Sequence, residues 1–448
     1  MNQVTLNIQK EYSCDVLICG GGVAGIAAAV SAAKSGVKVM LIENGGFLGG
    51  TATKGLVGPF MTCYDSKGEK QIIKGFFEEL VQRLIEKGAA ISHKECRGGD
   101  SHSGYRTPGH IGCTPFDSEA LKYVAEEMCL EAGVELLYHT TVIGCNKEGS
   151  LIDKVYAADN NDIISIKAKQ YVDTTGCAAL AAKAGAEVTR ENSDNTVQTA
   201  SLFGIITGVD KQVLDKYMEK NTEMRSRFFM DIFENGQDDG SFPCGTSKLR
   251  IYEAPNGNWI VNMAQTDEQW NELDGKEVTD TEIAQRKQLL KILEFLRKNI
   301  PGLENIKLLY TASDIGIRES RRIVGKRTMT LEDMQNATRF EDRIAVCANS
   351  IDIHLKKGVS YSAHNTENYY IPLSCLISKN VDNLFAAGKC LSADRYAFAA
   401  VRVMPPSMAM GQAAGIAAAT AVLDGVLAAD VDYKKVQSEL TKRGAVID

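Results

Sequence analysis

The sequence has 448 residues, of which 44% are hydrophobic and 24% charged, and its formal net charge is −7. This length allows a large buried core and predicts two or three domains. The negative charge and the absence of a basic arm argue against nucleic acid as a partner. No uncharged run of about 18 apolar residues occurs and the first residues are polar, so we expect no membrane span, no signal peptide and a cytoplasmic location.

The 12 cysteines are scattered along the chain. They form no C-x-x-C pair, and no histidines cluster at the spacing of metal ligands. This pattern predicts reduced thiols, as in cytosolic proteins, and no metal site.

The most informative stretch is "CDVLICGGGVAGIAAAVSAAKSGVKVMLIEN" near the start of the chain. The apolar run Val16 to Cys19 predicts a strand buried on both faces, and Val37 to Ile42 predicts a second strand. The small residues from Ala24 to Lys34 predict a helix that packs closely on a sheet and ends at Gly36. Strand, helix and strand in this order indicate a βαβ unit.

Three glycines at the turn before this helix complete the pattern G-x-G-x-x-G. Gly20 allows a tight turn, Gly22 lets the backbone approach a pyrophosphate, and Gly25 lets the helix pack closely on the strand. The helix N-terminus offers free N–H groups to phosphates. Glu43 stands 21 residues after Gly22, where a carboxylate accepts hydrogen bonds from ribose hydroxyls and repels a 2′-phosphate. The stretch therefore predicts a site for NAD or FAD, but not NADP.

Several later segments have clear helix or strand patterns. Lys74 to Glu86 and Asp117 to Ala132 predict helices, the second with Asp117 as its N-cap. Val134 to Ile143 predicts a strand, and Tyr171 to Glu187 a second strand, turn and small-residue helix. Val209 to Ile300 differs, because it holds both tryptophans and most of the long polar side chains, and we interpret it as an inserted cap domain.

Three features favour FAD over NAD. The second strand runs into the glycine-rich loop Asn44 to Phe60 instead of continuing in regular βα alternation. Asp382 to Ala387 predicts a late strand that leads to Gly388, and Pro405–Pro406 predicts a helix that begins near Ser407. The N–H groups of such a helix would face the negative charge of a reduced flavin. A second G-x-G-x-x-G, as expected of a separate NAD(P)H domain, is absent.

On these motifs, together with "GGTAT" and "VDTTG", the chain resembles glutathione-reductase-type flavoproteins. More narrowly, it resembles the bacterial FAD-dependent oxidoreductase family related to fumarate reductase and succinate dehydrogenase flavoproteins. The likeness extends over nearly all of the chain outside Val209 to Ile300. It implies pyrophosphate contacts at the first glycines, a ribose contact at Glu43, a backbone contact to adenine at Val142 and a flavin-facing helix after Pro406. The residues thus assigned to the cofactor are Gly20, Gly22, Val23, Ala24, Gly25, Glu43, Asn44, Gly49, Gly50, Thr51, Thr53, Val142, Thr175, Gly176, Gly388, Ser407, Met408 and Gly411.

The chain departs from these relatives in three ways. Lys389 stands where many of them carry an acidic residue. The C-x-x-x-x-C dithiol that the disulfide reductases carry is absent after the second strand, which excludes that branch, and no loop offers a histidine for covalent attachment of the flavin. We therefore expect non-covalent FAD.

The expected fold is α/β. A Rossmann-like FAD-binding domain with a central parallel sheet would comprise residues 1–208, with an excursion at 66–116, and residues 311–448, with a substrate-side excursion at 350–380. An inserted α+β substrate or cap domain would comprise residues 209–310. A homo-oligomer is a further expectation from the resemblance.

Catalysis needs an acid or base and a group that binds a substrate carboxylate or carbonyl. His354, next to Asp352, is the first candidate, with a hydrogen-bonded structural histidine as the alternative. Tyr370 and its neighbour Tyr369 would line the isoalloxazine ring or pack in the core. Arg402 is seven residues after Arg395, so on a helix the two share a face and either would bind a substrate anion, clamp the cofactor or form a buried ion pair.

Two further groups have weaker signals. Arg318, Arg321 and Arg322 would lie near the flavin or form ion pairs with Glu319. The long polar loop Lys94 to Cys113 carries Tyr105, Arg106 and His110, which would close over a substrate or remain structural.

The sequence thus predicts an FAD-dependent oxidoreductase that transfers hydride between a small organic substrate and flavin N5 and passes electrons to an unidentified external acceptor. A flavin oxidase or monooxygenase that uses oxygen is the alternative enzyme. A flavin-binding protein of tRNA modification, or a scaffold, is the alternative of another class.

Overall fold

A five-stranded parallel sheet forms the centre of the larger domain in the computed structural model, which describes residues 7–107, 109–190, 197–266, 270–354, 361–363 and 367–448. The strand order is β19-β8-β2-β3-β4, and all neighbours pair in parallel. The strands are β2 (Val16–Cys19), β3 (Val39–Ile42), β4 (Glu135–Leu137), β8 (Gln170–Asp173) and β19 (Leu384–Ala386). This arrangement confirms the predicted α/β fold with a Rossmann-like sheet.

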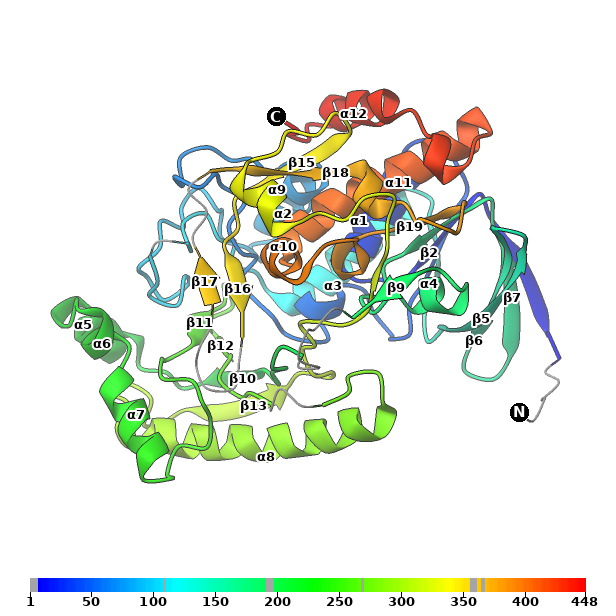
Figure 1. Cartoon of the computed structure of the whole chain (residues 1–448). Coiled ribbons are helices and arrows are strands. Elements are labelled where there is room, and N and C mark those ends of the chain that lie inside the picture. The colour runs from blue at the N-terminus through cyan, green and yellow to red at the C-terminus, as the bar shows by residue number, and fades with distance from the viewer. Residues whose placement is uncertain (1–6, 108, 191–196, 267–269, 355–360, 364–366) are drawn as a thin grey trace.

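Both faces of this sheet are covered, as the continuous apolar strands require. Val16 and Ile18 pack in one core with helices α1 (Val23–Ala33) and α11 (Met404–Asp424). Leu17 and Cys19 point the other way and pack against a second sheet. The alternation follows from the period of two residues along a strand. In Figure 1 the two helices lie side by side next to the sheet.

The second sheet has the order β1-β7-β6-β5. Its strands are β1 (Lys10–Ser13), β5 (Thr141–Glu148), β6 (Leu151–Ala158) and β7 (Ile163–Lys167). The single strand predicted for Val134 to Ile143 is wrong, because the chain leaves the parallel sheet after Leu137 and enters this second sheet at Thr141. The cause is a turn at His139, which has a left-handed backbone with φ 51°.

Helices α2 (Phe76–Glu86), α3 (Ser118–Glu131) and α4 (Ala179–Lys183) lie where the sequence predicts helices. Asp117 is the N-cap of α3, since its carboxylate accepts a hydrogen bond of 2.9 Å from the backbone N–H of Glu119. The predicted strand, turn and helix of Tyr171 to Glu187 are present as β8 and α4.

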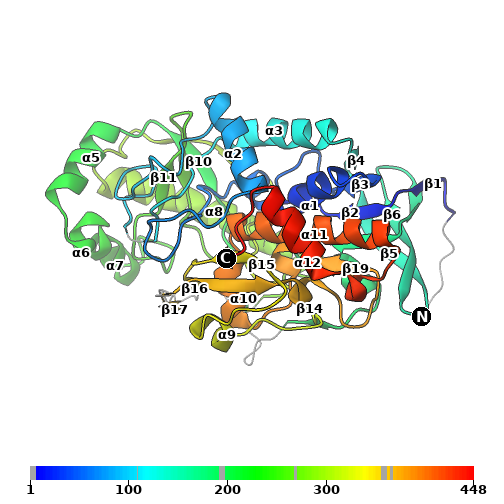
Figure 2. The same cartoon turned by 90° about the horizontal axis from the view of Figure 1, so that it is seen from above.

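A smaller α+β unit packs beside the larger domain, at the bottom of Figure 1 and on the left in Figure 2. Its antiparallel sheet has the order β11-β12-β10-β13, and the long helix α8 lies along it. Trp259, Leu289 and Phe295 belong to its separate core. The strands and helices are β10 (Gly204–Thr207), α5 (Lys211–Lys220), α6 (Met224–Arg227), α7 (Met230–Asp238), β11 (Ile251–Glu253), β12 (Trp259–Val261), α8 (Gly275–Asn299) and β13 (Lys307–Thr311). Strand β10 lies before residue 209, so this sheet extends beyond the boundary drawn from sequence. We call this unit the cap.

The rest of the chain returns to the larger domain. Its elements are β9 (Val188–Thr189), β14 (Arg322–Ile323), α9 (Leu331–Gln335), β15 (Arg343–Cys347), β16 (Ile351–Ile353), β17 (Tyr361–Ala363), β18 (Tyr369–Pro372), α10 (Arg395–Val401) and α12 (Tyr433–Lys442). Parts of the predicted excursion at 350–380, namely residues 355–360 and 364–366, lie outside the described residues.

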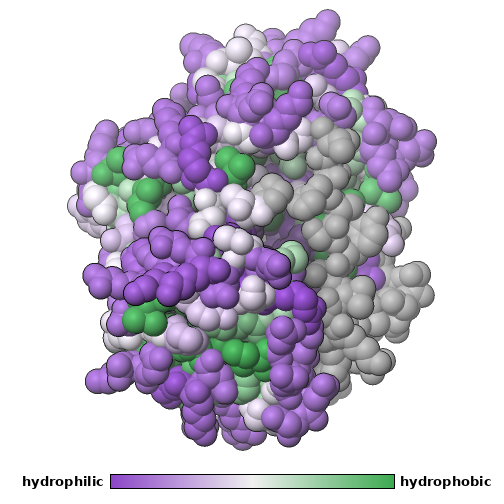
Figure 3. Space-filling model, turned by 90° about the vertical axis from the view of Figure 1, so that its left-hand side faces the viewer, coloured by the Kyte–Doolittle hydropathy of each residue, from purple (hydrophilic) through white to green (hydrophobic). Residues whose placement is uncertain are grey.

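The face that carries the outer end of the cap is mainly hydrophilic, and its hydrophobic residues form separate groups (Figure 3). None of the helices that the structure describes is both long and apolar enough to cross a membrane. Neither observation identifies a partner.

Candidate cofactor and substrate site

A cavity of about 1430 Å³ lies between the carboxyl ends of the parallel strands and the cap. Ligand-binding pockets usually hold about 300–1,000 Å³, so this cavity has room for a dinucleotide together with a small substrate. The residues that line it come from the turn after β2, the loop after β3, the end of β8, the start of α11 and the inner face of the cap. Its place at the carboxyl ends of parallel strands is the usual ligand site of open α/β sheets.

The turn from β2 into α1 gives the clearest test of whether this chain fits a dinucleotide. A Cβ added to Gly25 would lie 1.9 Å from the carbonyl oxygen of Gly20, so helix and strand approach each other closely. A Cβ on Gly22 would meet no atom within 4 Å, because Gly22 faces the cavity. The backbone at Gly22 is therefore open to a ligand at the N-terminus of α1, where a pyrophosphate fits. Val23 and Ala24 line the cavity beside it.

Glu43 lies at the end of β3 and is buried. One carboxylate oxygen accepts a hydrogen bond of 2.7 Å from the N–H of Gly21, and the other accepts one of 2.8 Å from the N–H of Gly45. Lys54 lies 2.8 Å from the second oxygen and also donates to Asn44 at 2.5 Å. Glu43, Asn44 and Lys54 all line the cavity, and this end of it fits the ribose expected from the sequence.

The "GGTAT" loop places only part of its residues at the cavity. Gly50 and Thr51 line it, whereas Gly49 and Thr53 do not. Thr53 is buried, and its hydroxyl donates to the carbonyl of Leu48 at 2.7 Å. Thr53 therefore stabilises the loop from the side that faces away from the cavity.

At the end of β8, Thr175 and Gly176 line the cavity. The buried carboxylate of Asp173 fixes this turn, because it accepts hydrogen bonds from the backbone N–H and the hydroxyl of Thr175 at 3.0 and 2.7 Å. It also accepts one from the N–H of Ala181 in α4 at 2.9 Å. Asp173 thus holds the turn from the side of the core, and the opposite side of the turn faces the cavity.

Gly388 and Ser407 line the cavity, but Met408 and Gly411 do not. Met408 is fully buried, and a Cβ on Gly411 would lie 2.1 Å from the carbonyl oxygen of Ala24. Gly411 therefore serves the close packing of α11 on α1. Val142 is buried in the core between the two sheets and does not line the cavity either.

Helix α11 begins at Met404, three residues before the start predicted near Ser407. The expectation of several free N–H groups there needs correction, because Pro405 and Pro406 carry no N–H. The N–H of Ser407 already donates to the carbonyl of Val403 at 3.1 Å. The positive end of the helix dipole remains directed at the cavity.

His354 follows β16 and lines the cavity with Asp352 and Arg402. Nε2 of His354 lies 2.8 Å from a carboxylate oxygen of Asp352. Arg402 donates to the carbonyl oxygen of Asp352 at 2.7 Å and to Oε1 of Gln198 at 3.3 Å. The structure therefore joins His354, Asp352 and Arg402 in one polar cluster.

Burial and the charges in this cluster determine the protonation states of Asp352 and His354. Burial alone would raise the pKa of Asp352, but His354 and the guanidinium groups of Arg402 and Arg318 outweigh it and hold that pKa well below its usual value. Burial lowers the pKa of His354 to about 4, although Asp352 acts in the opposite direction. At neutral pH Asp352 is an anion and His354 is neutral, so Nε2 carries the proton and Nδ1 has a lone pair that can accept one.

Tyr370 and Arg395 do not line the cavity. Tyr370 lies in β18, where the guanidinium of Arg339 stands 5.8 Å from its ring centre. Arg395 begins α10, and its Nε lies 3.5 Å from Oε1 of Glu319. The structure therefore separates both candidates from His354. Arg395 and Arg402 lie at opposite ends of α10, and their guanidinium groups contact different residues.

Of the weaker candidates, Arg318, Arg106 and His110 line the cavity. Burial and nearby Arg402 lower the pKa of Arg318, although the guanidinium stays charged. Arg322 is fully buried against Phe398, with its guanidinium 4.7 Å from the ring centre, so it is part of the core.

Three cavity residues had no signal that sequence reasoning could use. Lys248 and Arg250 precede β11 in a segment without a motif, and Asn262 follows β12. Lys389 was seen only as a departure, yet it lines the cavity and donates to the carbonyl of Ile317 at 2.7 Å.

No curated protein matches this sequence. The fold is similar to that of a geranylgeranyl bacteriochlorophyll reductase-like protein from Thermoplasma acidophilum, at 14% identity and a TM-score of 0.51, over 96% of this chain and 83% of that one. It is also similar to p-nitrophenol 4-monooxygenase PnpA from Pseudomonas putida, at 11% identity and a TM-score of 0.50, over 96% and 84% of the two chains. The sequence pattern of one family, described as FAD dependent oxidoreductase, matches residues 15–440. The chain therefore belongs to this family of FAD-dependent oxidoreductases and is an enzyme whose cofactor is FAD.

Proposed function

We propose that the enzyme holds FAD non-covalently in the cavity, transfers hydride between a small organic substrate and flavin N5, and exchanges electrons with an external acceptor. When bound, FAD supplies the hydride acceptance that protein side chains lack. Within the wider flavoprotein group we place the chain near the fumarate reductase and succinate dehydrogenase flavoproteins, as the sequence motifs suggest.

The residues at one end of the cavity would hold the cofactor. The open backbone at Gly22 would take the pyrophosphate, Glu43 the ribose, and Gly388 and Ser407 the ribityl and flavin end. The donors at the pyrophosphate are backbone groups at a helix N-terminus, which suit phosphate oxygens.

The observation that carries the proposal is the His354–Asp352 pair in the same cavity as this glycine turn. Asp352 accepts a hydrogen bond from Nε2–H of His354 and fixes the orientation of the ring. Nδ1 of His354 is then available to take a proton from the substrate. Arg402 donates to Asp352 and Gln198 and holds the pair in place. Hydride removal from a C–H bond needs such a base when the neighbouring O–H or N–H loses its proton.

The first test is an absorbance spectrum of the purified protein before and after acid precipitation. Flavin that passes to the supernatant supports non-covalent binding, and a pellet that stays yellow overturns it. A colourless protein that takes up no added FAD overturns the whole proposal.

The second test is an anaerobic screen of small organic compounds for bleaching of the flavin band. Bleaching by a compound, reversed by an added artificial acceptor, supports hydride transfer to an external acceptor. Fast oxygen consumption by the reduced protein would instead favour an oxidase or monooxygenase.

A further inference from the structure

Three positive side chains gather at the cap end of the cavity: Arg106, Lys248 and Arg250. None of them forms an ion pair with an acidic side chain in the part of the chain that the structure describes. Nη2 of Arg106 and Nε of Arg250 are buried and have no hydrogen-bond partner among the described atoms. Buried donors of this kind are costly unless a ligand satisfies them.

The three groups act on one another electrostatically. Burial and nearby Arg106 lower the pKa of Arg250, and burial, Arg106 and Arg250 lower that of Lys248. The same surroundings hold the neighbouring His110 neutral, since burial and Arg106 lower its pKa to about 3. Asp352 acts electrostatically on Arg250 and His110, and it is already engaged by His354 and Arg402. The cluster therefore has an excess of positive charge that an anion would balance.

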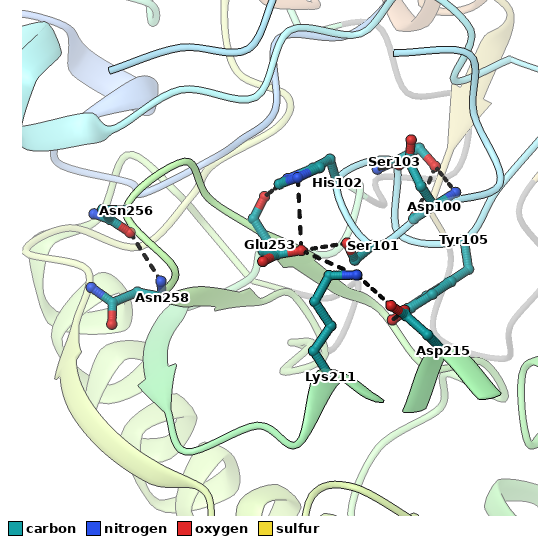
Figure 4. Close-up of polar contacts among 10 residues, drawn as sticks. All are labelled: Asp100, Ser101, His102, Ser103, Tyr105, Lys211, Asp215, Glu253, Asn256 and Asn258. Carbon is teal, nitrogen blue, oxygen red and sulfur yellow. Dashed lines mark hydrogen bonds and ion pairs between the residues drawn. The ribbon is translucent and has the colours of Figure 1, made fainter. Parts of the chain in front are cut away.

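The loop residues that precede Arg106 are bonded to the cap, as Figure 4 shows for Ser101 and Tyr105. Ser101 donates a short hydrogen bond to the carboxylate of Glu253 in β11, and the N–H of Glu253 donates to the carbonyl of Ser101 at 3.1 Å. The hydroxyl of Tyr105 donates to Asp215 of α5 at 2.8 Å. Arg106 follows Tyr105 directly, and Arg250 directly precedes β11, so the two arginines come from neighbouring, mutually anchored segments.

We propose that the substrate carries an anionic group, a carboxylate or a phosphate, that binds to Arg106, Lys248 and Arg250. Two guanidinium groups offer the planar pairs of donors that oxyanions accept, and Lys248 adds a point charge. Bound there, the substrate would extend from the cap toward His354, which places its reacting carbon on the flavin side of the cavity. This inference rests on the proposed function, because it assigns the substrate class of the same site.

The test measures anion binding to the FAD-loaded protein at low ionic strength, by the visible difference spectrum of the flavin and by calorimetry. The probes are benzoate as carboxylate, inorganic phosphate, and benzamide as a neutral shape control. We expect at least one anion to bind and benzamide not to bind. Binding by benzoate alone identifies a carboxylate substrate, and binding by phosphate alone identifies a phosphate ester.

The decisive variant is Arg250→Gln, which should weaken binding of the anion about 10–100-fold, the loss of one or two charge-assisted hydrogen bonds. Arg250→Lys keeps the charge and should restore part of the affinity. Arg83→Gln is the matched control, because Arg83 lies in α2, away from the cavity, and is paired with Glu79 and Glu131.

Equal affinity of the Arg250→Gln variant and the unchanged protein overturns the inference, as does failure of both anions to bind to protein that retains its flavin. Failure of the unchanged protein to load FAD overturns the proposed function instead. The flavin content of each variant thus separates the two failures.

Discussion

The two ends of the cavity are built from different parts of the polypeptide. At the proposed cofactor end, backbone groups after β2 and β8 face the cavity, and the carboxylates of Glu43 and Asp173 fix the turns. At the cap end, the charged side chains of Arg106, Lys248 and Arg250 line the cavity, and loops hold them. On the proposed assignment, the chain would recognise its cofactor by local backbone geometry and its substrate by side chains brought together from distant segments.

The largest effect is expected from a substitution at the cofactor end that the backbone cannot accommodate. Gly25→Ala would place a methyl group 1.9 Å from a backbone oxygen, so α1 must move away from β2. We expect a loss of stability of about 3 kcal/mol or more, measured by denaturant unfolding of the FAD-free protein. Ala27→Gly in the same helix is the control for a substitution without a clash; it loses helix propensity and one buried methyl group, with an expected loss of about 2 kcal/mol. An unchanged midpoint for Gly25→Ala would contradict the close packing.

Removal of the proposed base should affect the chemical step and leave cofactor binding unchanged. His354→Gln should lower kcat/KM about 10²–10³-fold, the usual contribution of a positioned acid or base, while the flavin content stays the same. The measurement is anaerobic flavin reduction by the substrate found in the screen. A decrease of less than about twofold would assign His354 a structural role.

The pH profile of kcat/KM tests the same role of His354. The pKa of His354 is lowered to about 4, so the free base persists down to that pH and activity should fall only as the pH approaches about 4. A lowered pKa also means that His354 adds stability above the ordinary histidine pKa of about 6.5, and that this stability is lost as the pH falls from there through about 4. Unfolding midpoints over this range separate the two effects. A kinetic limb near pH 6.5 that His354→Gln leaves in place would exclude His354 as its source.

A smaller change at the cofactor end should affect binding without affecting the fold. Gly22→Ala adds a methyl group that meets no protein atom within 4 Å but enters the space assigned to the pyrophosphate. We expect FAD to bind about 10–100-fold more weakly, while the FAD-free protein unfolds at the same denaturant concentration. This pair of results would contrast directly with Gly25→Ala. Unchanged affinity for FAD would move the pyrophosphate away from this turn.

The smallest effect is expected where a loop is fastened to the cap. Tyr105→Phe removes the 2.8 Å hydrogen bond to Asp215, which should cost about 1 kcal/mol of local stability. Hydrogen exchange of the loop should become about fivefold faster, because Arg106 loses part of its support. Tyr123→Phe in α3, an exposed tyrosine outside the cavity, is the control and should leave exchange in this loop unchanged.

The βαβ unit at the cofactor end was predictable from the sequence because its signals are local. The apolar run Val16 to Cys19, the glycines and Glu43 lie within one short βαβ unit, where spacing fixes which groups meet at a strand end. The N-cap at Asp117 and the start of α11 beside Pro405 were predictable for the same reason, since caps and proline act on adjacent residues.

The cluster of positive side chains at the cap end depends on the tertiary structure. Arg106 and Arg250 are far apart in the sequence and meet because the loop after α2 is bonded to β11. Periodicity placed Arg395 and Arg402 on one helix face, but could not show that their side chains reach different partners. The strand predicted through His139 failed because a single left-handed residue redirects the chain into another sheet, a decision that depends on contacts beyond the segment. Local spacing therefore specifies the backbone that holds the cofactor, whereas long side chains find their partners only when the whole chain has folded.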